Sequence, residues 1–311
     1  MSFIDLKNTD IYAVVNCGKY VVLTGSKLYI FTPDGKPVAS LKDFPYVLTV
    51  GLLPYDRIIV DCGKRKSYSI ISLKDGSELL RIPWPKIDGS LGFFCLSPDK
   101  QFLYDIFNKK MQQYILKADL SSGNVETFFV TQGLRAIRQI LCDEEGLPCL
   151  LETQLEIIAG RHMSINGVRL LFRDEWKPCS SYYWKSKWAF EHPRISQSFF
   201  GTVDYVLTRD FHVYSLSTGE SFSLFENETA FVPPENYGRL AHVTDDRRYA
   251  ILQFTSCNVV VDIAARKLAA CYLTDGERQG CIVEDKFWLP TGTGLEIKEF
   301  PPIEKPPRLQ I

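Results

Sequence analysis

Residues 92–107, GFFCLSPDKQFLYDIF, and residues 239–254, RLAHVTDDRRYAILQF, decide the fold of this chain. Each stretch consists of an apolar run, a polar turn and a second apolar run, and Ser97 aligns with Thr244 at the start of the turn. Short apolar runs bounded by turn residues are typical of β-strands joined in a hairpin. Because the two stretches lie far apart in the chain, they predict an internal repeat with a strand–turn–strand element in each unit.

A second repeated feature is an apolar run followed by a glycine-containing turn, as in YIFTPDGK, YSIISLKDGS, YILKADLSSGN, MSINGV and VYSLSTGE. The glycines are Gly35, Gly76, Gly123, Gly167 and Gly219, so the steps are 41, 47, 44 and 52 residues. Glycine suits tight hairpins because it adopts positive φ without a Cβ clash. In the next run, VVVDIAARK, Arg266 stands where the glycine would fall, which predicts a different turn with negative φ.

Together the two features describe a unit of four short strands, a to d, that recurs every 40–45 residues or so, the period of a β-propeller blade. We therefore expect an all-β chain that forms a seven-bladed β-propeller of four-stranded antiparallel blades, as a single domain over residues 1–311. The predicted units begin near Ile11, Tyr46, Leu91, Ala136, Ile195, Leu240 and Cys281. The fourth unit has an alternative, because Leu134, Ile137 and Leu141 are spaced as on a helical turn.

The interiors of many predicted strands are continuous apolar runs, such as VVLTG, RIIVDC, AILQF and NVVVDI. A sheet that is covered on both faces needs this pattern, and stacked blades supply such cover. For the outer strand of the last blade, the N-terminal residues 3–6 compete with the C-terminal tail IEKPPRLQI. We favour the N-terminal strand because Pro306 and Pro307 cannot donate to a ladder.

The pattern resembles the repeats of WD40-like and YVTN-like propellers over nearly the whole chain. The resemblance concerns architecture only, since the Trp-Asp dipeptide and the Gly-His pair of WD40 repeats are absent. It implies that the d–a and b–c loops lie on one face of the propeller, and the a–b and c–d hairpins on the other.

Aromatic residues gather in the predicted d–a loops, above all in DEWKPCSSYYWKSKWAFEHP between units four and five. Trp and Tyr supply large contact areas at small entropic cost and dominate binding hot spots. The candidate partner-binding residues are Trp84, Trp176, Tyr182, Tyr183, Trp184, Trp188 and Tyr237. The alternative is that these rings pack locally on the blades or plug the channel mouth.

Basic residues occupy the predicted b–c loops, whereas the predicted a–b turns are mainly acidic, with Asp245, Asp246, Glu284 and Asp285 among them. A basic aromatic face would steer an anionic partner toward it. The candidate steering residues are Lys64, Arg65, Lys66, Lys109, Lys110 and Arg209. The alternative is that these charged residues merely belong to solvent-exposed turns.

Composition excludes several classes of protein. With 36 Lys and Arg against 37 Asp and Glu, the formal charge is −1, so we expect no nucleic-acid binding through bulk positive charge. No apolar run is long enough to cross a bilayer, and the N-terminus lacks the pattern of a signal peptide, which predicts a cytoplasmic protein without a membrane span. Nine cysteines without paired CxxC spacing indicate reduced core thiols.

Motifs for chemistry are missing from the sequence. The four histidines lack metal-ligand spacing, and neither a nucleophile elbow nor a phosphate-binding loop occurs, so we predict no catalytic residue, metal or cofactor. We therefore predict a non-catalytic scaffold, monomeric on its own, that binds a protein or peptide on its aromatic, basic loop face. The alternatives are a small-molecule or carbohydrate-acting propeller enzyme with its site at the central channel, and a binder of RNA or another polyanion.

Overall fold

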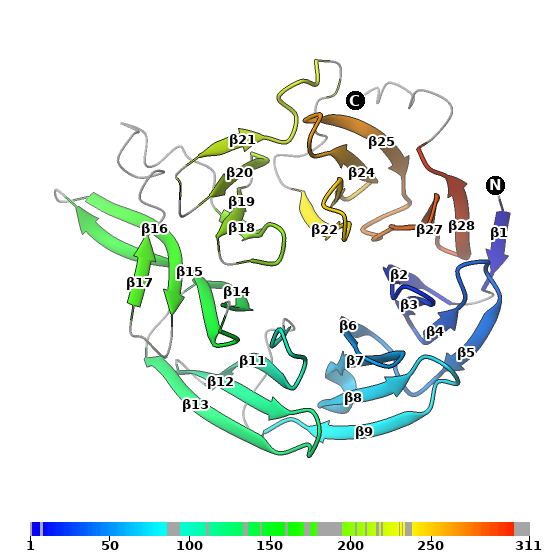
Figure 1. The fold of residues 1–311 in the computed structure, drawn as a ribbon, viewed down its shortest axis with the longest axis horizontal. Helices are drawn as coiled ribbons and strands as arrows, with labels where there is room; N and C mark the ends of the chain where they lie inside the picture. The colour runs from blue at the N-terminus through cyan, green and yellow to red at the C-terminus, as the bar shows by residue number, and fades with distance from the viewer. Residues whose placement is uncertain are drawn as a thin grey trace. The chain divides into compact units, whose positions relative to one another are not determined.

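The computed structural model describes most of the chain, and nearly all of the regular structure in it is β-strand (Figure 1). The described residues are 2–6, 9–85, 94–109, 112–132, 136–143, 145–158, 161–170, 175–178, 195–202, 204–208, 210–215, 218, 220–229, 231, 233 and 238–301. Among them, no helix is long and apolar enough to pass through a membrane.

The chain divides into two compact units, and the first consists of residues 1–80 and 223–311. Four sheets of the described residues belong to it. One contains β2 (Ile11–Asn16), β3 (Val21–Gly25), β4 (Leu28–Phe31) and β5 (Pro37–Leu41). The next contains β6 (Val47–Leu53), β7 (Arg57–Cys62), β8 (Ser67–Ser72) and β9 (Glu78–Pro83), which ends just past the unit boundary. The third contains β22 (Arg239–Val243), β23 (Tyr249–Gln253), β24 (Cys257–Asp262) and β25 (Lys267–Leu273).

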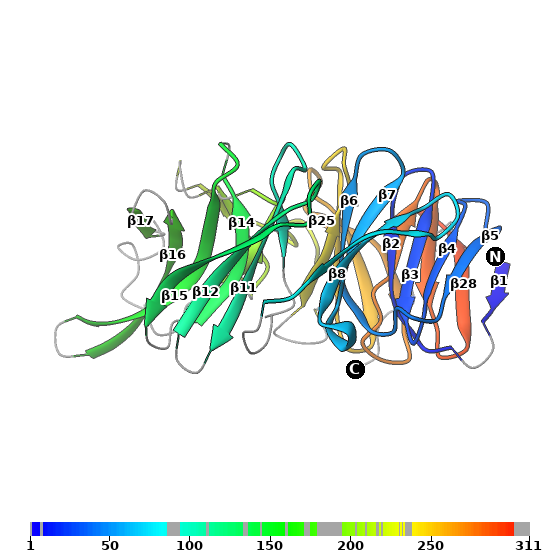
Figure 2. The same ribbon diagram turned by 90° about the horizontal axis from the view of Figure 1, so that it is seen from below.

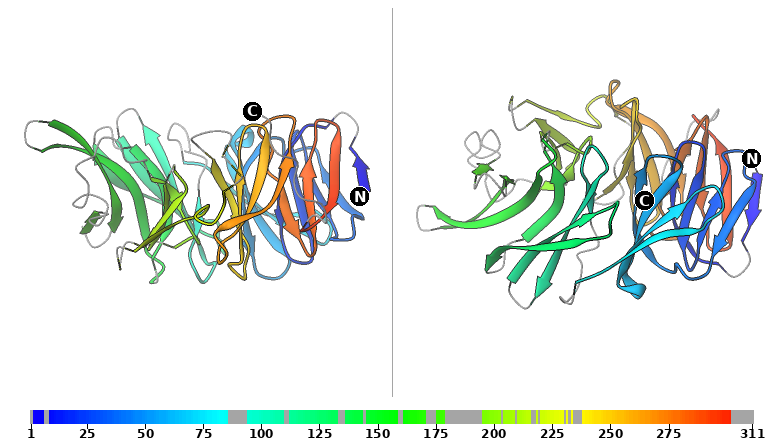
Figure 3. Two further views of the ribbon diagram at one scale, coloured as in Figure 1. Left: turned by 90° about the horizontal axis from the view of Figure 1, so that it is seen from above. Right: turned by 60° about the horizontal axis from the view of Figure 1, so that its bottom comes forward.

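The fourth sheet of this unit joins the two ends of the chain. It contains β26 (Cys281–Val283), β27 (Lys286–Pro290) and β28 (Gly294–Glu299), and its outer strand is the N-terminal β1 (Ser2–Asp5). The register pairs Phe3 with Glu296 and Asp5 with Gly294. In Figure 1 the blue strand β1 lies beside β28, and Figures 2 and 3 agree. The N-terminal segment therefore supplies the fourth strand of this sheet.

The second unit covers residues 81–222, and three sheets of its described residues have the same organisation. The first contains β10 (Cys95–Leu96), β11 (Phe102–Lys109), β12 (Gln112–Asp119) and β13 (Val125–Gln132). The second contains β14 (Ala136–Cys142), β15 (Pro148–Ile158), β16 (Arg161–Leu170) and β17 (Glu175–Pro178), and the third β18 (Ile195–Ser198), β19 (Tyr205–Thr208), β20 (His212–Ser215) and β21 (Ser221–Ser223). Figure 2 shows the long β15–β16 hairpin in green; beyond Thr153 and Gly167 these two strands pair only with each other.

The sheets are four-stranded and antiparallel. Within each sheet the strands follow one another in chain order, apart from the N-terminal strand β1, which joins the last sheet. The protein is an all-β propeller with four-stranded antiparallel blades, as the repeat predicts. Apart from β1, the first strands of the sheets begin at Ile11, Val47, Cys95, Ala136, Ile195, Arg239 and Cys281, within a few residues of the predicted unit starts.

The continuous apolar runs are explained by the packing between neighbouring sheets. In β3, Val21 and Leu23 face the core shared with β26–β28, while Val22 faces the core shared with β6–β8. In β27, Trp288 and Phe287 divide in the same way between two cores. Both faces of these sheets are therefore covered, and the side-chain period of two sends alternate residues to different interfaces.

Two local predictions and the helical alternative for the fourth unit are wrong. Residues 136–142 form strand β14 and no helical turn: a bulge between Ile137 and Gln139 breaks the alternation and imitates helical spacing. Gly167 lies inside β16, opposite Glu152, because the β15–β16 hairpin is longer than expected. Arg266 has a φ of 53°, so its turn uses the left-handed conformation in spite of the Cβ.

Candidate functional site

A cavity of about 390 Å³ opens at one end of the strands of the first unit. The d–a and b–c connections meet at this end, because Val47, which begins β6, pairs with Cys62, which ends β7. The walls come from the beginnings of β2, β6 and β22, the ends of β3 and β23, and the segment before β26. The cavity thus lies on the loop end for which partner binding is predicted.

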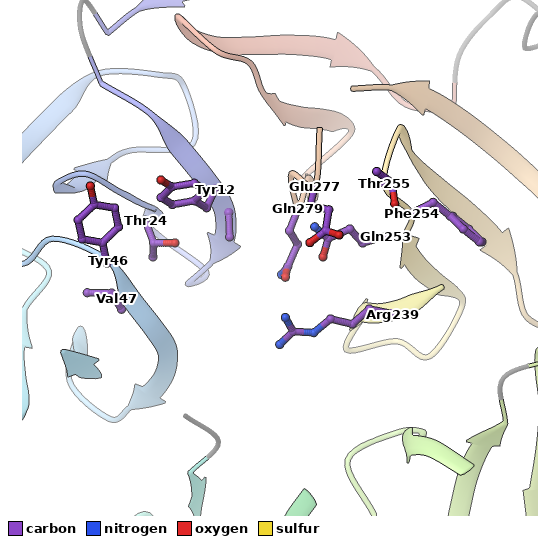
Figure 4. A pocket seen from close by; sticks show the side chains of 11 residues that line it. Tyr12, Thr24, Tyr46, Val47, Arg239, Gln253, Phe254, Thr255, Glu277 and Gln279 are labelled. Atoms are coloured by element: carbon purple, nitrogen blue, oxygen red, sulfur yellow. The ribbon is translucent and has the colours of Figure 1, made fainter. Parts of the chain in front are cut away.

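Two tyrosines form one wall of the cavity (Figure 4). Tyr12 and Tyr46 are 39% and 50% exposed, and their ring centroids are 6.1 Å apart. Tyr12 is the extra residue of a β-bulge, since the register between β2 and β3 shifts between Ile11 and Ala13. Bulges re-aim side chains, and here the bulge brings a large aromatic ring to the opening of the cavity.

The facing wall is polar and charged. It carries Arg239 from the start of β22, Gln253 from the end of β23, and Glu277 and Gln279 from the connection between β25 and β26 (Figure 4). A guanidinium, a carboxylate and two amides within one small cavity offer hydrogen-bond donors and acceptors to a ligand. Such a mixture of aromatic and polar groups suits a peptide backbone or polar side chain.

Main-chain hydrogen bonds hold the Gln279 segment against β2. The Gln279 N–H donates to the Tyr12 carbonyl at 2.8 Å, and the Val14 N–H donates to the Gln279 carbonyl at 2.9 Å. Ala13 and Gln279 form an isolated parallel bridge. The two walls of the cavity are therefore connected through the backbone.

A buried asparagine fixes the same segment from the other side. Asn258 of β24 is fully buried; its Nδ2 donates to the Arg278 carbonyl at 2.8 Å, and its Oδ1 accepts the Gly280 N–H at 3.0 Å. The Arg278 side chain pairs with Asp10 at 2.8 Å and with Asp275 at 2.5 Å. Glu277 and Gln279 thus extend from a segment that is anchored at Arg278 and Gly280.

The connection before β2 approaches the end of β3 very closely. A Cβ placed on Gly25 would lie 1.9 Å from the Asp10 carbonyl oxygen, so only glycine fits there. The Gly25 carbonyl accepts the Tyr46 N–H at 2.7 Å, which ties the second tyrosine to the same point. The Asp10 carboxylate accepts a hydrogen bond from the Tyr12 phenol and thereby raises its pKa, so Tyr12 stays neutral at physiological pH.

The basic run 64–66 lies at the same end of the first unit, in the b–c connection between β7 and β8. Lys64 and Lys66 are exposed, whereas Arg65 is engaged. Its guanidinium lies 3.2 Å from the Glu78 carboxylate and 4.4 Å from the centre of the Phe44 ring. Of these three predicted steering residues, two are therefore presented to solvent and one stabilises the loop.

The other predicted steering residues belong to the second unit. Lys109 is the last residue of β11, opposite Gln112, and so lies in a strand and not in the b–c loop. The β11–β12 hairpin is longer than the sequence suggested, and its pairing reaches Lys109. Lys110 and Arg209 lie outside the described residues.

The predicted aromatic residues are only partly described. Trp84 is half-buried and packs edge-on against Phe107, with ring centroids 5.5 Å apart. The predicted loop position of Trp176 is wrong: Trp176 lies in the outer strand β17, opposite Arg169, because the insertion begins with a strand. The remaining candidates, Tyr182, Tyr183, Trp184, Trp188 and Tyr237, lie outside the described residues.

The opposite end of the first unit is acidic. A second cavity of about 550 Å³ lies at the a–b turns and is lined by Asp245, Asp246, Glu284 and Asp285. These are carboxylates that the sequence predicts in a–b turns. His242 also lines this cavity, and burial lowers its pKa, so that the imidazole stays neutral.

Metal-ligand clusters and disulfides do not occur among the described residues. Within the part of the chain that the structure describes, no three His, Cys, Asp or Glu residues are grouped as metal ligands. The eight described cysteines form no disulfide.

No family model matches the chain, and no curated protein matches it in sequence. Among solved structures, the chain is similar to BamB from Moraxella catarrhalis, with a TM-score of 0.44 and 11% sequence identity over 93% of this chain and 84% of that one. The likeness to WD40-like and YVTN-like repeats therefore remains one of architecture.

Sequence reasoning placed partner binding at the loop end where this cavity opens, but it did not single out the residues of the cavity. Tyr12, Tyr46 and Arg239 each stand within one residue of a predicted unit start, which is the signal that could have found them. Glu277 and Gln279 follow a turn and resemble ordinary solvated residues, so nothing in the sequence distinguishes them.

Proposed function

We propose that this protein is a non-catalytic propeller that binds a protein through an extended peptide segment at the cavity between Tyr12 and Arg239. The observation that carries the proposal is the pair of exposed tyrosines beside a cavity lined by Arg239, Gln253 and Gln279. Exposed aromatic rings next to a polar depression have the composition of a binding hot spot. Backbone hydrogen bonds hold the segments that carry the rings, so binding would lose little conformational entropy.

The chemistry of the site favours a peptide with acidic side chains. Arg239 and the two glutamine amides can donate to a carboxylate inside the cavity, and Lys64 and Lys66 lie exposed at the same end of the unit. These lysines would raise the association rate of an anionic partner, and the effect would weaken with salt. Glu277 would accept hydrogen bonds from the peptide backbone.

We also propose that the sheets of both units are the blades of one seven-bladed propeller domain. The support is the recurrence of the same four-stranded antiparallel sheet in both units and at the predicted spacing. A single cooperative unfolding transition of the whole chain would agree with one domain, whereas two separate transitions would contradict it.

Selection from a peptide-display library of random sequence tests the binding proposal. We expect enriched peptides rich in Asp and Glu, and at least a ~10-fold weaker affinity in a Tyr12→Ala/Tyr46→Ala variant, as for a hot spot worth about 1.4 kcal/mol or more. The matched control is Tyr55→Ala: Tyr55 is 84% exposed but lies in the a–b turn at the other end of the same sheet as Tyr46.

An equal loss of peptide affinity in Tyr55→Ala and in Tyr12→Ala/Tyr46→Ala would contradict the proposed site. Enriched peptides whose affinity none of the three substitutions changes would contradict it as well. Binding to a glycan array in place of peptides would favour the carbohydrate alternative. Arg239→Ala should remove the preference for acidic peptides, because the guanidinium that would pair with a peptide carboxylate is lost.

A further inference from the structure

Two cysteines from neighbouring inner strands of the second unit lie side by side. Cys95 begins β10 and Cys142 ends β14, and their Sγ atoms are 3.6 Å apart and hydrogen-bonded although 47 residues separate them in sequence. Both side chains are half-buried. They pack against a core that includes Tyr104, Ile140 and Leu150.

The two thiols differ in character. The hydrogen bond with Cys95 lowers the pKa of Cys142, against the opposing effect of burial. The same hydrogen bond, together with burial, raises the pKa of Cys95 well above its ordinary value. Because the thiolate is the nucleophile, Cys142 would react first, with Cys95 next to it as the resolving thiol.

No other hydrogen bond described joins thiols of two different sheets. The Cys17 and Cys62 thiols donate to main-chain carbonyls, those of Val15 and Pro45, at 3.7 Å. Cys257 and Cys271 also share a hydrogen bond, but both belong to the β22–β25 sheet. Of the contacts described, the one between Cys95 and Cys142 brings together thiols of two different sheets.

We propose that Cys95 and Cys142 form an oxidation site at which hydrogen peroxide produces a disulfide between β10 and β14. The Cys142 thiolate attacks one peroxide oxygen, which breaks the O–O bond and gives a sulfenic acid and hydroxide. The sulfur of Cys95 then attacks the Cys142 sulfur and displaces the sulfenic oxygen, which leaves as water with the thiol proton. In sum, two thiols and one hydrogen peroxide give one disulfide and two waters.

The site belongs to the second unit and shares no residue with the proposed peptide cavity, so its failure would leave that proposal untouched. The disulfide would close a long stretch of chain and couple two neighbouring sheets covalently, which restricts the unfolded state. We therefore expect oxidation to raise the thermal midpoint of the protein, and reduction with dithiothreitol to reverse the rise.

Peptide mapping of the full chain tests the proposal. The reduced protein is treated with graded hydrogen peroxide, its remaining thiols are alkylated, and digests are analysed without reduction by mass spectrometry. We expect a cross-linked peptide pair that contains Cys95 and Cys142 and is lighter than the two separate peptides by two hydrogen atoms. In Cys95→Ser the cross-link should disappear and dimedone should label Cys142.

Cys62→Ser is the matched control and should form the same cross-link to the same extent, because the Cys62 thiol bonds a carbonyl. The proposal is overturned if Cys95 and Cys142 both remain fully alkylated after peroxide treatment, or if Cys142 links to another cysteine instead. Mapping of the unsubstituted chain distinguishes these outcomes even where a serine variant fails to fold.

Discussion

Replacement of Asn258 by Ala tests how the charged wall of the cavity is held. The substitution removes two hydrogen bonds, at 2.8 and 3.0 Å, and leaves the Arg278 carbonyl and the Gly280 N–H without that partner. Asn258 is fully buried, so bulk water does not reach the two groups to replace the lost hydrogen bonds. Each buried polar group left unsatisfied costs about 1–3 kcal/mol, so for the two groups we expect the free energy of unfolding to fall by about 2–6 kcal/mol.

Urea unfolding followed by tryptophan fluorescence measures this loss. With an m-value of about 2–3 kcal/mol/M, the urea midpoint should fall by about 1–3 M. The matched control is Asn227→Ala: Asn227 is exposed, and its Nδ2 donates a single hydrogen bond to the Ala265 carbonyl at 3.0 Å. Water can replace that bond, so we expect a loss within about 0.5 kcal/mol.

A midpoint for Asn258→Ala equal to that of Asn227→Ala would refute the reasoning, because burial would then make no difference. The same variant should also bind selected peptides more weakly at a temperature where it is folded, since Glu277 and Gln279 lie on either side of Arg278. Unchanged peptide affinity would show that the wall keeps its shape without Asn258.

Three further predictions concern other parts of the fold. Burial lowers the pKa of His242 in the folded protein. The free energy of unfolding is therefore intact above the unfolded-state pKa of about 6.5 and falls as the pH drops below that pKa. His242→Gln should flatten the resulting fall in thermal midpoint between pH 7 and 5. Lys100 has a φ of 59°, and Lys100→Gly should raise the free energy of unfolding by about 0.5–1 kcal/mol in urea titrations. A Cβ on Gly294 would lie 2.3 Å from the Ile4 carbonyl oxygen, so Gly294→Ala should release β1 and make the N-terminus sensitive to limited proteolysis.

Turn chemistry explains why the architecture could be predicted from the sequence. In the turns after Ser97 and Thr244, the hydroxyl donates to an aspartate two residues later and accepts the N–H five residues later. Lys100 and Arg247 both adopt positive φ at the same place in these turns. The alignment of the two stretches therefore reflects one local structure that is encoded by adjacent residues.

The same turns show where local reasoning ends. The prediction for Arg266 assumed that only glycine would occupy the left-handed region, yet Arg266 has a φ of 53°. Its guanidinium forms an ion pair with Glu226, and the Asn227 N–H donates to its carbonyl at 3.0 Å. Contacts from a segment 40 residues away offset a local penalty of about 1 kcal/mol, and no reading of VVVDIAARK by itself contains them.

The cavity could not be predicted for a related reason. Its residues come from three sheets, and what brings them together is the approach of the Gln279 segment to β2 and of Gly25 to Asp10. A β-bulge decides where Tyr12 points, and the sequence contains only a tyrosine after an isoleucine. Tryptophan-rich loops attract attention in a sequence because tryptophan is rare, whereas a recognition surface depends on which ordinary residues the backbone gathers. The variants of Tyr12, Tyr46 and Tyr55 test whether position in the fold decides binding, since all three are exposed tyrosines and differ in where the fold has placed them.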